Sequence, residues 1–140
     1  MIKNAILIKL MLGVIILIAS AETAYSCRCI KQTLKTNYQR ADAVIVATVI
    51  EINDKSENIT EVKLQVSDAW KSDVTKTFVI QIGKTSCDIT VELNQEYTLY
   101  LKKLDATRWT TNLCMGNLPK NDSAKASKWL RSRGKQSRVS

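Results

Sequence analysis

The sequence of 140 residues contains no histidine. This absence excludes a Ser-His-Asp or Cys-His hydrolase, a HExxH zinc site and a histidine pH switch, because each depends on an imidazole. The sequence also lacks internal repeats, low-complexity tracts and clustered carboxylates with an acid–base role. We therefore expect a protein that is not an enzyme and that carries neither a cofactor nor a metal of its own.

No apolar run is long enough to span a bilayer, which takes about 20 residues. The longest uncharged apolar run, residues 10–19, is half that length and follows Lys3 and Lys9. A basic start, a short apolar core and a small-residue exit together predict a secretory signal peptide, so we expect an extracellular protein without a membrane span.

Two cleavage points satisfy the small-x-small rule. Cleavage after Ala21 leaves Glu22 first, whereas cleavage after Ser26 leaves Cys27 first and makes residues 1–26 the signal peptide. A lipoprotein signal ending at Cys27 is the weaker alternative, because Ala24 stands where such signals usually place Leu.

The four cysteines of a secreted chain predict a disulfide framework. A bond between Cys27 and Cys29 would close a very tight ring, so two pairings remain: 27–87 with 29–114, or 27–114 with 29–87. Each long-range bond is expected to contribute about 4 kcal/mol in the chain-entropy model. A four-thiolate zinc site is the rival interpretation, but the cysteines lack the C-x2-C to C-x4-C spacing of such sites.

The region after Cys27 has the pattern of a single, mostly β domain. Residues 43–52 form a β-branched run that predicts a strand buried on both faces. Alternating apolar residues predict further strands at 61–70, 78–82, 89–93, 97–101 and 108–114, with a turn at Asn94-Gln95. We expect a helix or turn at 30–40 and a last helix capped by Asp122 or Ser123. Five or six short strands without a βαβ rhythm predict a small antiparallel barrel or sandwich.

The net charge of +8 is unevenly distributed. Residues 27–116 hold 12 basic and 11 acidic side chains, whereas residues 117–140 hold seven basic side chains and one acid. Such a tail could bind a heparin-like polyanion or an anionic membrane, and nucleic acid is the least expected partner of a secreted protein. The alternative is a solvated, disordered end over residues 134–140.

Two further features have simple interpretations. Asn58-Ile59-Thr60 is a glycosylation sequon in an expected loop, and Asn121 begins a second one. We expect Trp70, Trp109 and Trp129 to be core residues rather than a ligand platform.

Several motifs occur in an order typical of one family. They are Cys27-Arg28-Cys29 at a cleavage point, ADAVIVATV at 41–49, a lone Cys87 after a β segment, EYTLYL at 96–101 and TNLC at 111–114. In these features the chain resembles the N-terminal domain of the tissue inhibitors of metalloproteinases, members of the netrin-like group of OB-fold modules. The resemblance covers most of residues 27–130.

The resemblance implies a five- to six-stranded OB-fold-like antiparallel barrel over residues 27–133, with a short N-terminal helix and a C-terminal helix. It also implies the pairing Cys27–Cys87 with Cys29–Cys114. In such an inhibitor, the α-amino group and carbonyl oxygen of the first residue, here Cys27, chelate the catalytic zinc of a metalloendopeptidase. The rest of the inhibitory ridge would be Arg28, Cys29, Ile30, Thr85 and Ser86.

The resemblance therefore predicts a secreted, monomeric metalloprotease inhibitor. The alternative is a netrin-like binding module that inhibits nothing and holds an extracellular protein or polyanion through its barrel face or basic tail. Only the first function requires Cys27 to be the first residue of the mature chain.

Overall fold

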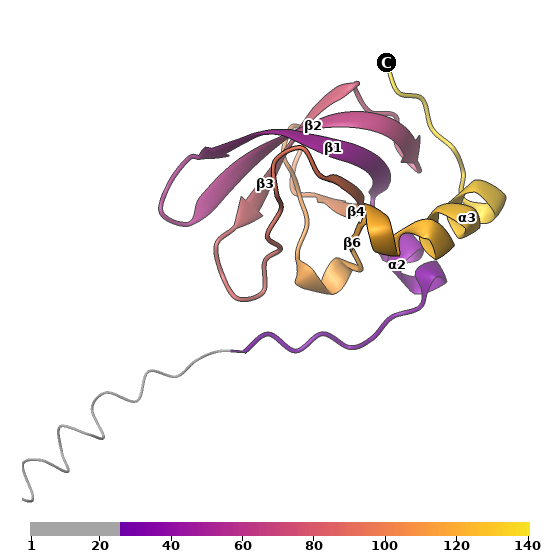
Figure 1. Ribbon diagram of the computed structural model, residues 1–140, viewed down its shortest axis with the longest axis horizontal. Coiled ribbons are helices and arrows are strands. Elements are labelled where there is room, and N and C mark those ends of the chain that lie inside the picture. Colours follow the sequence, from indigo (N-terminus) through magenta and orange to yellow (C-terminus); the bar gives the residue numbers. More distant parts are fainter. Residues whose placement is uncertain (1–25) are drawn as a thin grey trace, which may run out of the picture.

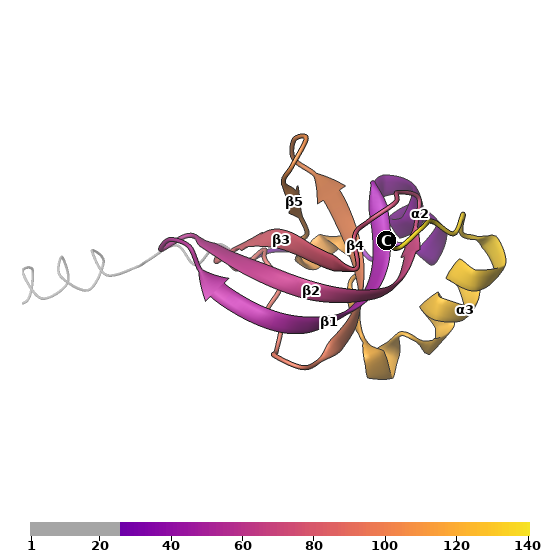
Figure 2. The ribbon, with the colours of Figure 1, turned by 90° about the horizontal axis from the view of Figure 1, so that it is seen from above.

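A computed structural model describes residues 26–140, so all but the last residue of the expected signal peptide lies outside the described residues. Figures 1 and 2 show a small barrel with two helices beside it. The strands are β1 (Ala43–Asp54), β2 (Ile59–Trp70), β3 (Thr77–Gly83), β4 (Glu96–Lys103), β5 (Trp109–Thr110) and β6 (Leu118–Pro119). This confirms the predicted mostly β, OB-fold-like barrel. No helix within residues 26–140 has the length and apolar character needed to cross a bilayer.

The barrel closes through five strands in the order β1-β2-β3-β5-β4, with β4 returning to β1 and β6 added on β4. All neighbours are antiparallel except β3 and β5, which pair in parallel at Gln81 and Thr110. The expectation of a purely antiparallel barrel is therefore corrected in one place. The reason is geometric, because a closed ring with an odd number of strands cannot alternate direction all the way round.

The first half of β1 is buried on both faces, as its continuous apolar run predicts. One face points into the barrel and the other lies under the helices, because successive side chains of a strand alternate. Beyond Val49 the strand is exposed in the long β1–β2 hairpin. The residues of β1 that point into the barrel are Ala43, Ile45, Ala47 and Val49.

The two helices, α2 (Leu34–Arg40) and α3 (Ala124–Arg133), cover one side of the barrel (Figure 2). Trp129 of α3 meets Tyr38 of α2 edge to face, with ring centroids 5.4 Å apart. The second apolar cluster lies beneath them and consists of Ala41, Val44, Trp70, Tyr100, Met115 and Leu130. Trp70 is a core residue, as expected, and Trp109 packs against Phe78 at the barrel.

One of the expected strands is absent, and another is much shorter than expected. Residues 89–93 form no ladder; Ile89 and Val91 pack against the barrel core, but no neighbouring strand pairs with their backbone. Residues 108–114 contain only the two-residue β5, followed by the 3-10 helix η1 (Leu113–Met115). The turn at Asn94-Gln95 is present, with Asn94 at φ 63°.

The last seven residues differ from the expected disordered tail. Five backbone hydrogen bonds join residues 135–140 to residues 69–76. The backbone N–H of Arg138 also donates to Asp73 Oδ1 at 2.8 Å, and Val139 packs against the barrel core. The backbone of residues 69–76 thus provides hydrogen-bond partners that order the last residues, and the composition of the tail does not predict this pairing.

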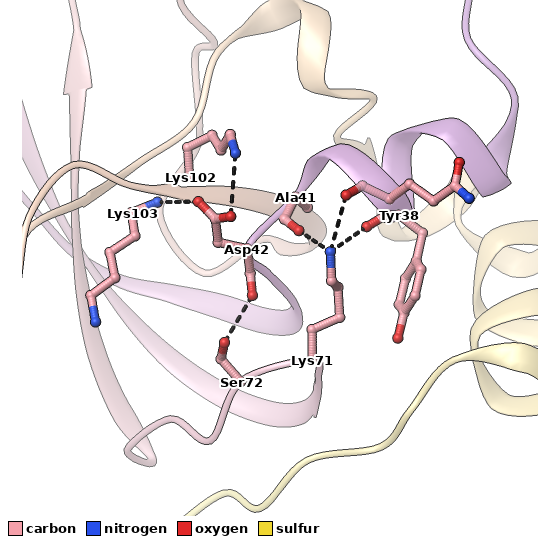
Figure 3. A network of polar contacts seen from close by, with 8 residues as sticks. Tyr38, Ala41, Asp42, Lys71, Ser72, Lys102 and Lys103 are labelled. Atoms are coloured by element: carbon pink, nitrogen blue, oxygen red, sulfur yellow. Dashed lines mark hydrogen bonds and ion pairs between the residues drawn. The ribbon is translucent and has the colours of Figure 1, made fainter.

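Lys71 joins β2, α2 and the C-terminal segment (Figure 3). Its ammonium donates to the carbonyls of Tyr38 (2.8 Å), Gln39 (3.2 Å) and Ala41, which lie at the C-terminal end of α2. Its backbone N–H donates to Lys135 O at 3.0 Å, although its φ of 73° is unfavourable for a side chain with a Cβ. Burial lowers the pKa of Lys71, and the nearby Asp42 opposes this shift.

Replacement of Lys71 by Met should lower the free energy of unfolding by about 2 kcal/mol, because three helix-end carbonyls lose a charged donor. The measurement is urea unfolding with the disulfides intact. Lys76→Met, at an exposed lysine of the neighbouring turn, is the control and should change stability by no more than about 0.5 kcal/mol. Equal stability of both variants would contradict the role assigned to Lys71.

Candidate functional site at the disulfide-linked N-terminal segment

Two disulfides tie the start of the described chain to the barrel. Cys27 bonds to Cys87 and Cys29 to Cys114, with Cα–Cα distances of 5.0 and 5.1 Å. Of the two pairings that the sequence allows, this is the one implied by the resemblance. The sulfurs of Cys27, Cys29 and Cys114 lie within 4.8 Å of one another, but all are oxidised in disulfides. A four-thiolate zinc site is thereby ruled out for this arrangement.

The two attachment points lie next to each other although 26 residues separate them in the sequence. Cys87 lies in the connection between β3 and β4, and Cys114 lies in η1. The backbone N–H of Leu113 donates to Cys87 O at 2.9 Å, which fixes the two loops side by side. The N-terminal segment is therefore held against one continuous edge of the barrel.

Asparagine side chains hold η1 in place. Asn112 Oδ1 accepts from the backbone N–H of Cys114 at 2.9 Å. The amide of Asn117 donates to Thr111 Oγ1 and Asn112 O, both at 2.8 Å, and its oxygen accepts from the backbone N–H of Tyr100, also at 2.8 Å. These hydrogen bonds satisfy backbone polar groups of the turn that have no partner in a β-ladder.

The loop that carries Cys87 is organised by Asp88. Asp88 Oδ2 accepts from the backbone N–H of Thr85 at 3.0 Å and from its hydroxyl at 2.7 Å. The hydroxyl oxygen of Thr85 in turn accepts from the backbone N–H of Cys87 at 3.2 Å. Gly83 leaves room for this carboxylate, because a Cβ there would lie 2.3 Å from Asp88 Oδ2 and would displace it.

The N-terminal segment, residues 26–33, has no regular secondary structure and runs along this edge towards α2 (Figure 1). Arg28, Cys29 and Ile30 are exposed, and Ile30 retains 82% of its accessible surface. A shallow groove of about 280 Å³ lies between the segment and η1, and half-exposed Leu113 lines it beside Ile30. The edge therefore combines two disulfides with exposed apolar side chains, a combination suited to a protein partner.

The structure places the predicted ridge residues on two neighbouring segments. Arg28, Cys29 and Ile30 lie on the N-terminal segment, and Thr85 and Ser86 lie on the exposed loop that the Cys27–Cys87 bond attaches to it.

Sequence reasoning missed Leu113 and Asp88. The signal for Asp88 is the spacing Thr85-x-x-Asp88, which is typical of a turn in which side chain and backbone bond reciprocally. Nothing comparable marks Leu113, whose exposure depends on the 3-10 turn. Asn58, in the exposed β1–β2 hairpin, and exposed Asn121 in η2 (Lys120–Asp122) remain predicted glycosylation sites.

No protein-family model matches this chain, and no curated protein matches it significantly.

Replacement of Asp88 by Ala should loosen the loop at 84–88, because Thr85 loses both bonds to the carboxylate. We expect a loss of about 1 kcal/mol in stability and faster amide hydrogen exchange at Thr85 and Cys87. Asp105→Ala is the matched control, since Asp105 accepts from the backbone N–H groups of Thr107 (2.9 Å) and Arg108 (2.8 Å) in a separate loop. The role of Asp88 would be contradicted if hydrogen exchange at residues 85–87 were unchanged in Asp88→Ala. It would also be contradicted if Asp105→Ala accelerated exchange at residues 85–87 equally.

Proposed function

We propose that the protein is a secreted inhibitor of zinc metalloendopeptidases, acting through Cys27 as the first residue of the mature chain. The observation that carries the proposal is the pair of disulfides that holds residues 27 and 29 on an exposed edge beside the loop at 84–88. An edge built in this way can offer a rigid chain terminus to another protein.

The chemistry of a chain terminus supports zinc chelation. A free α-amino group has an ordinary pKa near 7.7–8.0, so it gives up its proton to a metal at little cost near neutral pH. Together with the carbonyl oxygen of the same residue, it forms a five-membered chelate that can displace the nucleophilic water of the protease. The two disulfides preorganise this chelate, which reduces the entropy lost on binding.

The surroundings of Cys27 favour a protein as the ligand. Ile30 and Leu113 are exposed apolar residues next to the disulfide of Cys29, and such residues form the desolvated centre of many interfaces. A shallow groove of this kind offers little enclosure for a small molecule.

Arg28 and exposed Lys31 indicate the kind of protease that fits. In this binding mode Arg28 follows the chelating residue and enters the pocket beside the zinc. Burial of an unpaired guanidinium is costly, so the target would present an acidic or water-filled pocket there.

We expect Arg28→Thr to shift inhibition towards proteases with apolar pockets, and inhibition constants measured against both kinds of protease test this.

The decisive test is the N-terminus of the secreted protein. Mass spectrometry of the intact protein should give a chain that begins at Cys27. The mechanism requires this, because in a chain that begins at Glu22 the nitrogen of Cys27 belongs to an internal peptide bond. Addition of one Ala before Cys27 should then weaken inhibition at least a hundredfold, since the chelating amine becomes an amide. An Ala added after Ser140 is the control and should have no effect.

Inhibition that survives the N-terminal Ala would overturn the chelation mechanism. A chain that begins at Cys27, keeps both disulfides and inhibits no metalloendopeptidase would instead support the non-inhibitory binding module.

A further inference from the structure

The C-terminal part of the chain presents a concentrated positive charge that the proposed inhibition does not use. Residues 124–140 contain six basic side chains and no acid, and all six side chains are exposed. They are Lys125, Lys128, Arg131, Arg133, Lys135 and Arg138; we call them the C-terminal basic surface.

Helix α3 arranges three of these cations in a line. Ala126 and Leu130 are buried against the barrel, so the opposite face of the helix points to solvent. Lys125, Lys128 and Arg131 lie on that face at a spacing of three residues, which is about 4.5 Å along a helix axis. A line of evenly spaced cations suits an extended chain of anions better than a single ion.

The segment after α3 holds the remaining cations in place. The carbonyl oxygens of Lys135 and Arg138 accept backbone hydrogen bonds from Lys71 (3.0 Å) and Val74 (3.1 Å). The backbone N–H of Lys135 donates to the Tyr38 hydroxyl at 2.9 Å. Because the backbone is fixed, the surface loses less conformational entropy on binding than a disordered tail would.

The six cations are not neutralised by neighbouring acids. Within residues 26–140, none of the six forms a salt bridge. Asp73 bonds to the backbone N–H of Arg138, and Glu96 pairs with Lys120 at 3.5 Å. Arg131 shares a groove with Asp68 and Glu96 and is the most acid-flanked of the set.

We propose that the C-terminal basic surface binds a linear anionic polysaccharide outside the cell. The surface lacks what the other polyanionic partners need. Trp129 packs on Tyr38, so the helix offers no free aromatic ring for stacking nucleic-acid bases. The solvent face of α3 carries no large apolar side chain, which an interfacial membrane helix requires. Disulfides, moreover, form in oxidising compartments rather than beside intracellular nucleic acids.

The test uses the disulfide-bonded mature chain and a heparin oligosaccharide as the probe. The variant Lys125→Gln/Lys128→Gln/Arg131→Gln should bind roughly ten- to a hundredfold more weakly at 0.15 M NaCl, because fewer counterions are released. The plot of log affinity against log salt concentration, whose slope is negative, should become shallower by about 2 to 3 in this variant. The matched control, Lys55→Gln/Lys76→Gln/Lys103→Gln, has the same net charge and also alters only exposed residues.

Three results would overturn the proposal. Equal weakening in the control would show that net charge rather than this surface binds, and would overturn the proposal. So would a lack of heparin binding by the unchanged chain, or tighter binding to duplex DNA or to anionic vesicles at the same salt concentration. The proposal does not depend on protease inhibition, which is measured separately and should be unchanged in both triple variants.

Discussion

The two disulfides from residues 27 and 29 are the constraint on which the candidate site depends. The segment that they hold, residues 26–33, has no regular secondary structure, and segments of this kind are mobile unless they are tied down. Each bond closes a loop of 60 or 85 residues and should stabilise the fold by about 4 kcal/mol in the chain-entropy model. Their more important consequence is local, because they fix an irregular segment as part of a rigid surface.

The barrel makes this attachment possible through its one parallel pairing. Because β3 and β5 run in the same direction, the loops that follow them emerge at the same end of the barrel. One loop carries Cys87 and the other carries Cys114, and the bond from Leu113 N–H to Cys87 O joins them. A purely antiparallel neighbour in the place of β5 would send its following loop to the opposite end. The odd number of strands is thus directly connected with the position of the site.

Much of this arrangement is readable from the sequence, and the failures have physical causes. A continuous β-branched run predicts β1 correctly. Side-chain alternation reports which face is buried, so β2 to β4 and the inward side chains of Ile89 and Val91 are also predicted correctly. Alternation does not report whether a neighbouring backbone is available, so the ladder expected at 89–93 is wrong. The same limitation applies to residues 135–140, because their polar composition does not report that the backbone of residues 69–76 is available to pair with them. The disulfide pairing follows from the family resemblance alone, since the spacing of the cysteines left two solutions open.

The net charge of +8 acquires a different meaning once the structure is known. It does not spread over the barrel, whose charges nearly cancel, but gathers on α3 and on the segment that Lys71 and its neighbours fix beside β2. The N-terminal edge is held by covalent bonds, whereas the basic surface is held by hydrogen bonds and by the packing of Leu130 and Trp129. The two regions are nevertheless connected, because Tyr38 of α2, which follows the N-terminal segment, packs on Trp129 and accepts from the backbone N–H of Lys135. Met115 of η1 also lies in the same apolar cluster as Leu130. The two proposed interactions would therefore use separate surfaces that are tethered differently but supported by the same apolar cluster beneath the helices.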